Sequence, residues 1–514
     1  MVSNLNDKQT NSPLRHALLT FAGFMLIFLL YAIAVQVTDV NLEKLQQPTR
    51  QQQLLLVLRQ LADPNLTDPD LLDFTLGAES GPLQLSQTTR DTINLILETI
   101  FMALIATTIG TVLAVPVSFT AARNLMRDVK APLAAIMLAL TLLPIGGGIG
   151  FFLAKWMLSL AETANQQVLV GVVGTVIAGG ALWPLLQMNL GLEMDAGFSG
   201  QKLAVFLVRG LAALLLSLFL VSSLSHLGAR AGIWLLDKGI ILGAIGNFIK
   251  VIGEFFLLAL PSLMGLLGAF VAVALGSTYG QELVLRIAEG RARAITAVLT
   301  VTGTAIFVYA IGAGLNWLYQ FDNPANWTTI PATVVGIVLG TGSLFVAPKR
   351  PFAIGNAIYA ISRGILNTLR SIEPLIMAII FVVWVGLGPF AGVMALTLHT
   401  IAALGKLFSE QIEGISEGPI EAITATGANQ LQTITYAVIP QIIPPYIAYT
   451  LYRWDINVRM STIIGFVGGG GIGFLLSQSI RLLQYEDASV MMLAIAFVVS
   501  ALDYISSKAR TRII

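Results

Sequence analysis

Three charged side chains and an amide lie within seven residues of an otherwise apolar stretch. Arg453, Asp455, Asn457 and Arg459 all fall inside the run 441–467. A charge at membrane depth costs at least about 2.5–3.5 kcal/mol, so these groups must be paired or face a wet cavity. On a helix, Asp455 and Arg459 are four residues apart with the acid first, the favourable orientation for a pair. One positive charge is left over, which suits a path for an oxyanion, because a guanidinium binds such oxygens bidentately.

The same residues also have a structural interpretation, in which they lock the span to its neighbours. A second candidate group for the path is Arg370 with Ser371, followed by Glu373, at the start of the apolar run 372–388. Charges at a membrane interface also orient a helix, so both interpretations apply here. His399 lies alone in the next apolar run, and we expect it to be a buried hydrogen-bonding residue rather than a ligand.

A glycine run follows the charged span, at Gly468–Gly471 with Gly473. Consecutive backbone N–H groups in such a run can form a phosphate-binding nest. The run lacks the GxxxxGK[ST] pattern of a nucleotide-binding loop, so we do not expect a nucleotide site. We expect a flexible break at the end of the span, or close helix packing.

The composition indicates a membrane protein. Of the 514 residues, 56% are hydrophobic and only 11% are charged, whereas a soluble domain carries about 25% charged residues. The net charge of +1 gives no sign of a nucleic-acid partner. Cysteine is absent and the three histidines are far apart in sequence, so we expect no disulfide, no metal site and no bound cofactor.

Apolar runs long enough to cross a bilayer recur along the chain, and they predict an all-α polytopic membrane protein with about twelve spans. The segment 231–248 is also apolar, but Asp237 and Lys238 interrupt it, so we expect an interfacial or re-entrant helix there. The first run is too long for a signal peptide and is expected to be a retained span. The predicted spans are 16–37, 92–119, 132–155, 167–188, 203–226, 252–276, 294–318, 329–347, 372–388, 390–407, 441–467 and 488–505.

The Lys/Arg bias of the loops predicts that both termini are cytoplasmic. Positive residues in the loop 227–250 fall on the outer side and run against this rule. The polar stretch 38–91 lies outside, and its segment 51–61 has apolar residues at helical spacing. We expect this amphipathic helix to be a packed cap or part of a landing surface for a binding protein. The cytoplasmic positive clusters are Arg123, Arg127 and Lys130; Arg286, Arg291 and Arg293; Lys349 and Arg350; and Lys508, Arg510 and Arg512.

A polar stretch, 421–440, lies between two of the predicted spans. It resembles the EAA loop of ABC importer permeases in Glu421 and Ala422, in Gly427 six positions after the Glu, and in the closing Pro440. The resemblance implies a short cytoplasmic helix that docks into a groove on the ATPase subunit. We expect Pro419 to suit the helix start, with Glu421 in the first turn. We expect Gly427 to allow close approach of another backbone, and Pro440 to stop the element and begin the next span.

Three further segments, 107–124, 370–410 and 452–473, resemble the permeases of phosphonate and phosphite importers. The resemblance implies a MetI-like core of about six spans, plus an insertion of about six spans that has no recognised counterpart. It divides the chain into 1–128 (first span, external segment and first core span), 129–349 (the insertion) and 350–514 (the core with the EAA loop).

The resemblance implies a permease subunit of the cell inner membrane, which translocates a small phosphorus oxyanion by alternating access and is not itself an enzyme. It implies as partners an ATPase dimer that carries ATP and magnesium, an external solute-binding protein and a second permease copy, since the chain has one EAA loop. A permease for another solute, such as methionine, remains an alternative. So does a secondary carrier driven by an ion gradient, although 130–348 does not visibly repeat the flanking halves.

Overall fold

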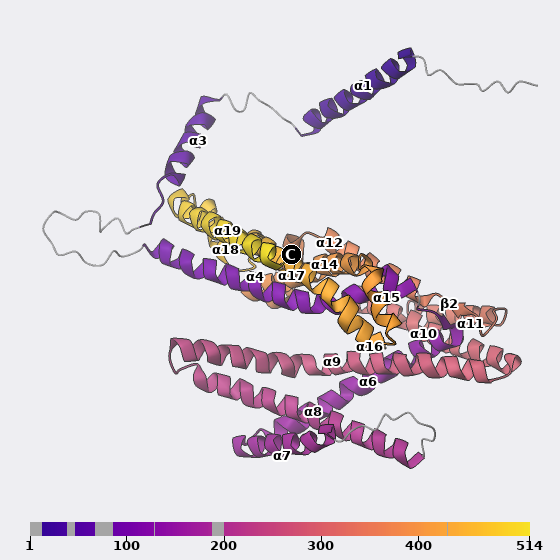
Figure 1. The fold of residues 1–514 in the computed structure, drawn as a ribbon. Coiled ribbons are helices and arrows are strands. Elements are labelled where there is room, and N and C mark those ends of the chain that lie inside the picture. Colours follow the sequence, from indigo (N-terminus) through magenta and orange to yellow (C-terminus); the bar gives the residue numbers. More distant parts are fainter. Residues whose placement is uncertain are drawn as a thin grey trace, which may run out of the picture. The chain divides into compact units, whose positions relative to one another are not determined.

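The computed structural model describes residues 13–38, 47–66, 86–127, 129–187, 200–428 and 430–513. It is almost entirely helical (Figure 1), which confirms the predicted all-α class. The chain forms two compact units, one of 1–122 with 360–514 and one of 123–359. The sequence-based division had placed its boundaries at 128/129 and 349/350, and the role of the inserted region stays a prediction.

The first unit contains the candidate site. At its centre, α14 packs on α4, α13 and α17, and α19 packs on α17. Small side chains permit this packing: a Cβ placed on Gly110 of α4 would lie 2.6 Å from Cγ2 of Thr400 on α14. The elements are α1 (Pro13–Val37), α3 (Pro48–Leu61), α4 (Gln87–Thr120), α12 (Ile354–Ser371, which begins in the other unit), α13 (Pro374–Val385), α14 (Pro389–Glu413), α15 (Glu417–Ala425), α16 (Gln430–Thr433), the π-helix η3 (Ile434–Val438), α17 (Ile439–Gly465), α18 (Ile472–Arg481) and α19 (Tyr485–Ile513).

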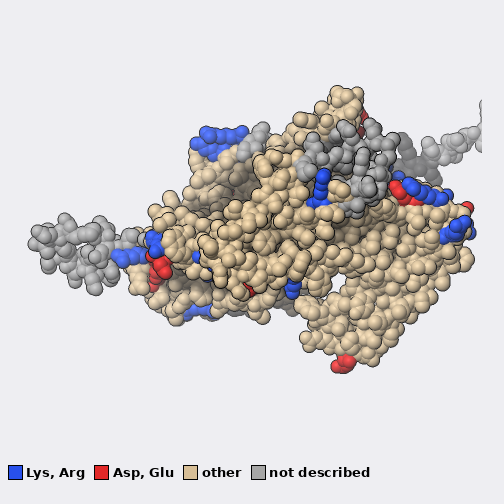
Figure 2. All heavy atoms as spheres, turned by 90° about the horizontal axis from the view of Figure 1, so that it is seen from below, with Lys and Arg blue, Asp and Glu red and all other residues tan. Residues whose placement is uncertain are grey.

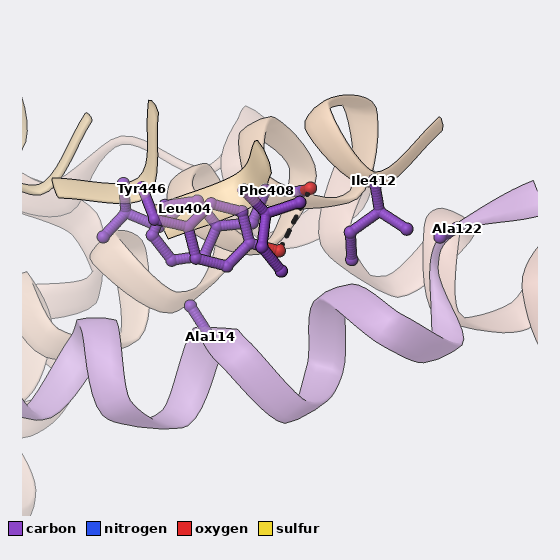
Figure 3. Close-up of a cluster of buried hydrophobic side chains, with 7 residues drawn as sticks. Ala114, Ala122, Leu404, Phe408, Ile412 and Tyr446 are labelled. Atoms are coloured by element: carbon purple, nitrogen blue, oxygen red, sulfur yellow. Dashed lines mark hydrogen bonds between the residues drawn. The ribbon is translucent and has the colours of Figure 1, made fainter. Parts of the chain in front are cut away.

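A buried aromatic pair joins the end of α14 to the start of α17 (Figure 3). The rings of Phe408 and Tyr446 stack with centroids 3.8 Å apart and planes 8° apart. Tyr446 also donates its hydroxyl hydrogen to the Phe408 carbonyl at 3.3 Å. Ala114 and Ala122 close the cluster from the N-terminal part of the unit. These contacts fix the two helix ends between which the 421–440 stretch emerges.

The glycine run after α17 is closely packed. Gly468, Gly470 and Gly471 have φ of +89°, +81° and +72°, values that residues other than glycine rarely adopt. The Gly471 N–H donates to Glu98 Oε1 at 2.7 Å, and the next N–H, at Ile472, donates to the Thr99 hydroxyl at 2.9 Å. A carboxylate of the chain itself therefore occupies the N-terminus of α18, where a bound phosphate would otherwise lie.

The second unit is a set of long packed helices. Its most extensive pairing is between α6 and α9. A two-residue antiparallel ladder pairs Ala131 with Phe352 and brings the two ends of the unit together. The elements are α5 (Arg123–Arg127), β1 (Ala131–Pro132), α6 (Leu133–Ala164), α7 (Val168–Gln187), α8 (Gly200–Leu235), α9 (Ile240–Arg286), α10 (Glu289–Tyr319), η2 (Pro324–Asn326), α11 (Thr329–Ser343) and β2 (Pro351–Phe352).

The separate interfacial helix predicted over 231–248 is wrong. The segment contains the end of α8 and the start of α9, joined by a short turn. Asp237 and Lys238, which interrupt the apolar pattern, lie in this turn, and Gly239 has a φ of +109° that permits the reversal. With 47 residues, α9 is about 70 Å long at 1.5 Å per residue and exceeds a hydrocarbon core of about 30 Å.

Each of the twelve predicted apolar runs overlaps a helix over most of its length. Within the described residues, nine helices are long and apolar enough to span a membrane, or ten if the bent pair α12–α13 counts as one span. The remaining two runs lie on α11, which has only 15 residues, and on α17, which carries the charged group. Charged side chains are sparse over most of the face in Figure 2, as a lipid-facing surface requires.

The predicted amphipathic helix over 51–61 lies on α3. Leu54, Leu55 and Leu58 are more than half exposed. Asn65, just beyond this helix, donates to Asp487 Oδ1 at 3.0 Å and so joins the segment to α19. A landing surface for a binding protein at this position stays a prediction.

Candidate functional site

The charged residues of α17 are divided between two faces of the helix. Arg459 donates to Asp455 Oδ2, as the four-residue spacing predicts. Asp455 is only 2% exposed, whereas the Arg459 side chain is 44% exposed. Asp503 and Arg510 of α19 lie close enough to act on the Asp455 charge. This pair therefore belongs to the contact between α17 and α19.

Asn457 points to the opposite side, into the contact between α17, α4 and α14. Its amide group donates to the Thr107 hydroxyl at 2.8 Å and to the Thr400 hydroxyl at 2.9 Å. The side chain is completely buried. Asn457 therefore ties three helices together, which favours its structural interpretation over direct contact with a solute.

Arg453 is the exception among the charges of α17. It is 8% exposed, and its Nε and Nη2 atoms have no hydrogen-bond partner among the described residues. None of the ion pairs formed by the described residues includes it. A buried and unpaired guanidinium costs several kcal/mol of desolvation, roughly as any isolated buried ion does. Buried charges with this desolvation cost are typical of functional sites, and a guanidinium there can bind an anion.

His399 lies near the middle of α14, and Arg453 is close enough to act on its charge. Arg370 and the backbone of Ile372 are also close to its imidazole. His399 is 9% exposed, and its Nδ1 atom is buried without a partner. The sequence predicted a satisfied buried histidine, so the unsatisfied Nδ1 was missed. The signal in the sequence was weak: a single imidazole inside an apolar run.

A sharp break in the helical path lies next to this histidine. α12 ends at Ser371, α13 begins at Pro374, and the two helices bend by 88°. The exposed Arg370 stands at the end of α12, close to His399. Ser371 is also exposed, but its hydroxyl donates to the Thr368 carbonyl of its own helix at 2.7 Å. In transporters, broken helices supply binding groups near the middle of the membrane.

The predicted docking element is a short exposed helix, α15. Glu421 and Ala422 are both exposed. Glu417 occupies the first turn, so the placement of Glu421 in that turn is wrong. Gly427 has a φ of +84°, and nothing in the described chain lies within 4 Å of a Cβ placed on it. The glycine is therefore required by the left-handed turn that ends α15, and no close backbone approach occurs within the described chain.

Pro440 lies at the start of α17, as expected, but it does not interrupt the helical backbone before it. Helical backbone continues from α16 through η3 into α17, and Pro440 is the second residue of α17. The Ile439 N–H bonds to the Ile434 carbonyl, five residues back. This wider π turn precedes a residue that has no N–H to give to the helix. Asn429 of the predicted 421–440 stretch lies outside the described residues.

The Gln441 side chain joins the two ends of the docking element by hydrogen bonds. Its Oε1 accepts the backbone N–H of Ser416, the residue before α15, at 2.9 Å. Its Nε2 donates to the Ala437 carbonyl at 2.8 Å and, more weakly, to the Ser416 carbonyl at 3.4 Å. Nothing in the loop resemblance pointed to this residue.

The described part of the chain contains no group of His, Cys, Asp or Glu residues that could hold a metal ion. The site instead consists of a broken helix, a buried cation and an exposed helix in a polytopic helical protein. This combination defines the class as the membrane subunit of a transport system.

Comparison with known proteins identifies the family. Residues 332–510 match the family of binding-protein-dependent transport system inner membrane components. A putative cryptic phosphonate transport system permease protein of Escherichia coli is 46% identical over 121 residues, which are 24% of this chain and 99% of that relative. The chain therefore belongs to this family, whose members are transport subunits rather than enzymes.

Other relatives match over smaller shares of their length. The phosphite transport system permease protein of Stutzerimonas stutzeri is 41% identical over 182 residues, 35% of this chain and 66% of the relative. The phosphate-import permease protein of Mycolicibacterium smegmatis is 37% identical over 185 residues, 36% of this chain and 35% of the relative. The chain spans about half to two thirds of the phosphite permeases it matches.

Among solved structures, the chain is similar to one of the MetNI methionine ABC transporter in an inward-facing conformation. The match covers 45% of this chain and 97% of the other, with 19% identity and a TM-score of 0.28.

Proposed function

We propose that this chain is the membrane subunit of an ATP-driven importer that translocates phosphite, a phosphonate or a related small phosphorus oxyanion by alternating access. The observation that carries the proposal is Arg453, a buried guanidinium without a partner among the described residues. It lies within the matched region, and the relatives named above are permeases for phosphorus oxyanions. A guanidinium offers such an anion two parallel N–H donors.

The proposed path follows the broken helix. The exposed Arg370 attracts the anion at the break between α12 and α13, and Arg453 receives it in the buried part of the unit. Asp455 and Arg459 take no part, because they pair with each other on another face of α17. The path contributes electrostatics and position, and no covalent bond is made or broken.

The proposed partners follow from the exposed docking element. α15 presents Glu421 and Ala422 to a groove on an ATPase subunit, which carries the ATP and magnesium. Closure of the ATPase dimer moves α15, and Gln441 passes the movement to α17, the helix that carries Arg453. An external binding protein delivers the solute. A second copy of this chain supplies the second docking helix, and both termini lie in the cytoplasm.

The test is uptake of labelled phosphite in a host that has no phosphite or phosphonate import of its own. The chain is expressed with the proposed ATPase and solute-binding protein partners. We expect uptake that requires all three proteins and is lost when the ATPase cannot hydrolyse ATP. Uptake that survives this loss and follows an ion gradient would identify a secondary carrier instead. Uptake of methionine but not phosphite would identify the other solute class.

A further inference from the structure

We propose that His399 contacts the translocated oxyanion and selects its singly charged, still protonated form. The inference rests on the proposed function and goes beyond it, because it assigns a specificity-determining role to a residue that the sequence indicated as structural. Three observations carry it: the surroundings of the imidazole, the unsatisfied Nδ1 atom, and the broken helix beside it.

Two guanidiniums are close enough to His399 to act on its charge. Arg453 approaches from α17 and Arg370 from α12. On α4, Thr107 accepts a hydrogen bond from Asn457, and Gly110 packs against Thr400, the residue next to His399. From α13, Met377 and Ala378 pack in the same apolar cluster as residues of α14. Burial of the ring and the two guanidiniums both disfavour a further positive charge, so we assign a neutral imidazole.

The neutral imidazole has one donor and one acceptor nitrogen. The backbone of Ile372, at the helix break, is close enough to act on the ring as a hydrogen-bond acceptor, and Nδ1 is the buried nitrogen without a partner. We therefore assign the N–H to the other ring nitrogen, Nε2. Nδ1 is left as an acceptor, on a side chain that is nine-tenths buried.

A hydrogen-bond acceptor near an arginine suits an anion that carries both an ionised oxygen and an O–H group. The N–H groups of Arg453 bind an ionised P–O⁻ oxygen, and Nδ1 accepts a hydrogen bond from a P–OH group. A monoanion of phosphite or a phosphonate carries both groups. A dianion has no O–H to donate and would bring a negative oxygen against the Nδ1 lone pair. A polar group built for one hydrogen bond discriminates strongly against an analogue that cannot make it.

The experiment measures phosphite uptake by the complete transporter, with ATPase and binding protein, from acid to alkaline pH. Each variant is compared with the wild type at the same pH, which cancels the pH responses of the other subunits. The second ionisation of phosphite is followed in the same buffers by phosphorus NMR. For the wild type we expect uptake to fall with the monoanion fraction.

His399→Gln is the decisive variant, because its amide can turn to donate to P–O⁻ as well as to accept. At acid pH we expect this variant to take up phosphite at nearly the wild-type rate. As the dianion forms, its uptake rate relative to the wild type should rise about tenfold. His399→Leu should lose about tenfold at acid pH and much less at alkaline pH. His226→Gln, in the other unit, is the matched control and should leave the profile unchanged.

The inference would be overturned if the uptake rate of His399→Gln relative to the wild type were the same at every pH. It would also be overturned if wild-type uptake did not change as phosphite ionises. Both outcomes leave the proposed function intact, because phosphite is still imported. Failure of the proposed function has a different signature, in which the wild type imports no phosphite at any pH. If His399→Leu does not assemble, the pH profile of His399→Gln still decides.

Discussion

Gln441 Oε1 accepts the backbone N–H of Ser416 at 2.9 Å. The bond joins the residue that precedes α15 to the first turn of α17. The two ends of the docking element are therefore held together by a hydrogen bond. Because α17 also carries Arg453, this bond connects the exposed helix to a helix of the proposed anion site.

Gln441→Leu should uncouple the two ends of this connection. Each lost hydrogen bond contributes about 0.5–1.5 kcal/mol, so we expect solute transported per ATP hydrolysed to fall about two- to tenfold, with the subunits still assembled. Transport and ATP hydrolysis are measured together in proteoliposomes. Gln478→Leu, at an exposed position on α18, is the control. Full coupling in Gln441→Leu would show that the bond does not transmit the movement.

Arg459→Ala should reduce stability more than it alters the path. It leaves the buried Asp455 carboxylate without its partner, which costs roughly 1–3 kcal/mol when a buried acceptor is left unsatisfied. Unfolding temperature in detergent measures the loss. The double variant Asp455→Asn with Arg459→Ala removes the uncompensated charge and should recover most of it. If the double variant is less stable than Arg459→Ala alone, Asp455 is held by other groups.

Arg453→Leu should reduce uptake without reducing stability. Removing an unpaired buried charge does not destabilise a protein and can stabilise it. The loss of charge-assisted hydrogen bonds to the anion, about 1.5–3 kcal/mol, should reduce uptake about 10- to 100-fold. Arg453→Lys keeps the charge but not the planar fork, and should fall between the wild type and Arg453→Leu. Arg481→Leu, at an exposed arginine of α18, controls for charge loss alone. Normal uptake by Arg453→Leu would remove Arg453 from the path.

Glu421→Arg should abolish transport-coupled ATP hydrolysis without affecting the fold. The residue is exposed on α15, and surface substitutions usually change stability by less than about 0.5 kcal/mol. Copurification of the ATPase and solute-stimulated hydrolysis measure the effect. Glu289→Arg makes the same charge change at another exposed position on the predicted cytoplasmic side and should copurify normally. Equal ATPase recovery from both variants would contradict docking through α15.

The helices could be predicted because a bilayer imposes a length on an apolar run. The runs 92–119 and 390–407 lie inside α4 and α14 for this reason. The turn between α8 and α9 was missed because two charges in an apolar segment do not distinguish a turn from a helix that lies at the interface. The π turn before Pro440 was missed because its hydrogen-bond shift leaves no mark on the hydrophobic period.

The candidate site could be predicted only in part. The pairing of Asp455 with Arg459 is local and follows from their spacing. The isolation of Arg453 depends on what α14 and α12 bring to it, so it is a property of tertiary packing. For the same reason, the contacts of Asn457 with two threonines and the unpartnered Nδ1 of His399 could not be predicted from the sequence.

The most direct test of the account is a cross-link from the docking helix. The chain has no cysteine, so Ala422→Cys places a single thiol on α15. Membranes from the native host are treated with a thiol-reactive bifunctional cross-linker, and the adduct is identified by mass spectrometry. We predict a covalent product with an ATPase subunit, formed only when the cytoplasmic face is accessible. A thiol labelled by an impermeant reagent from outside intact cells, with no ATPase adduct, would contradict the account.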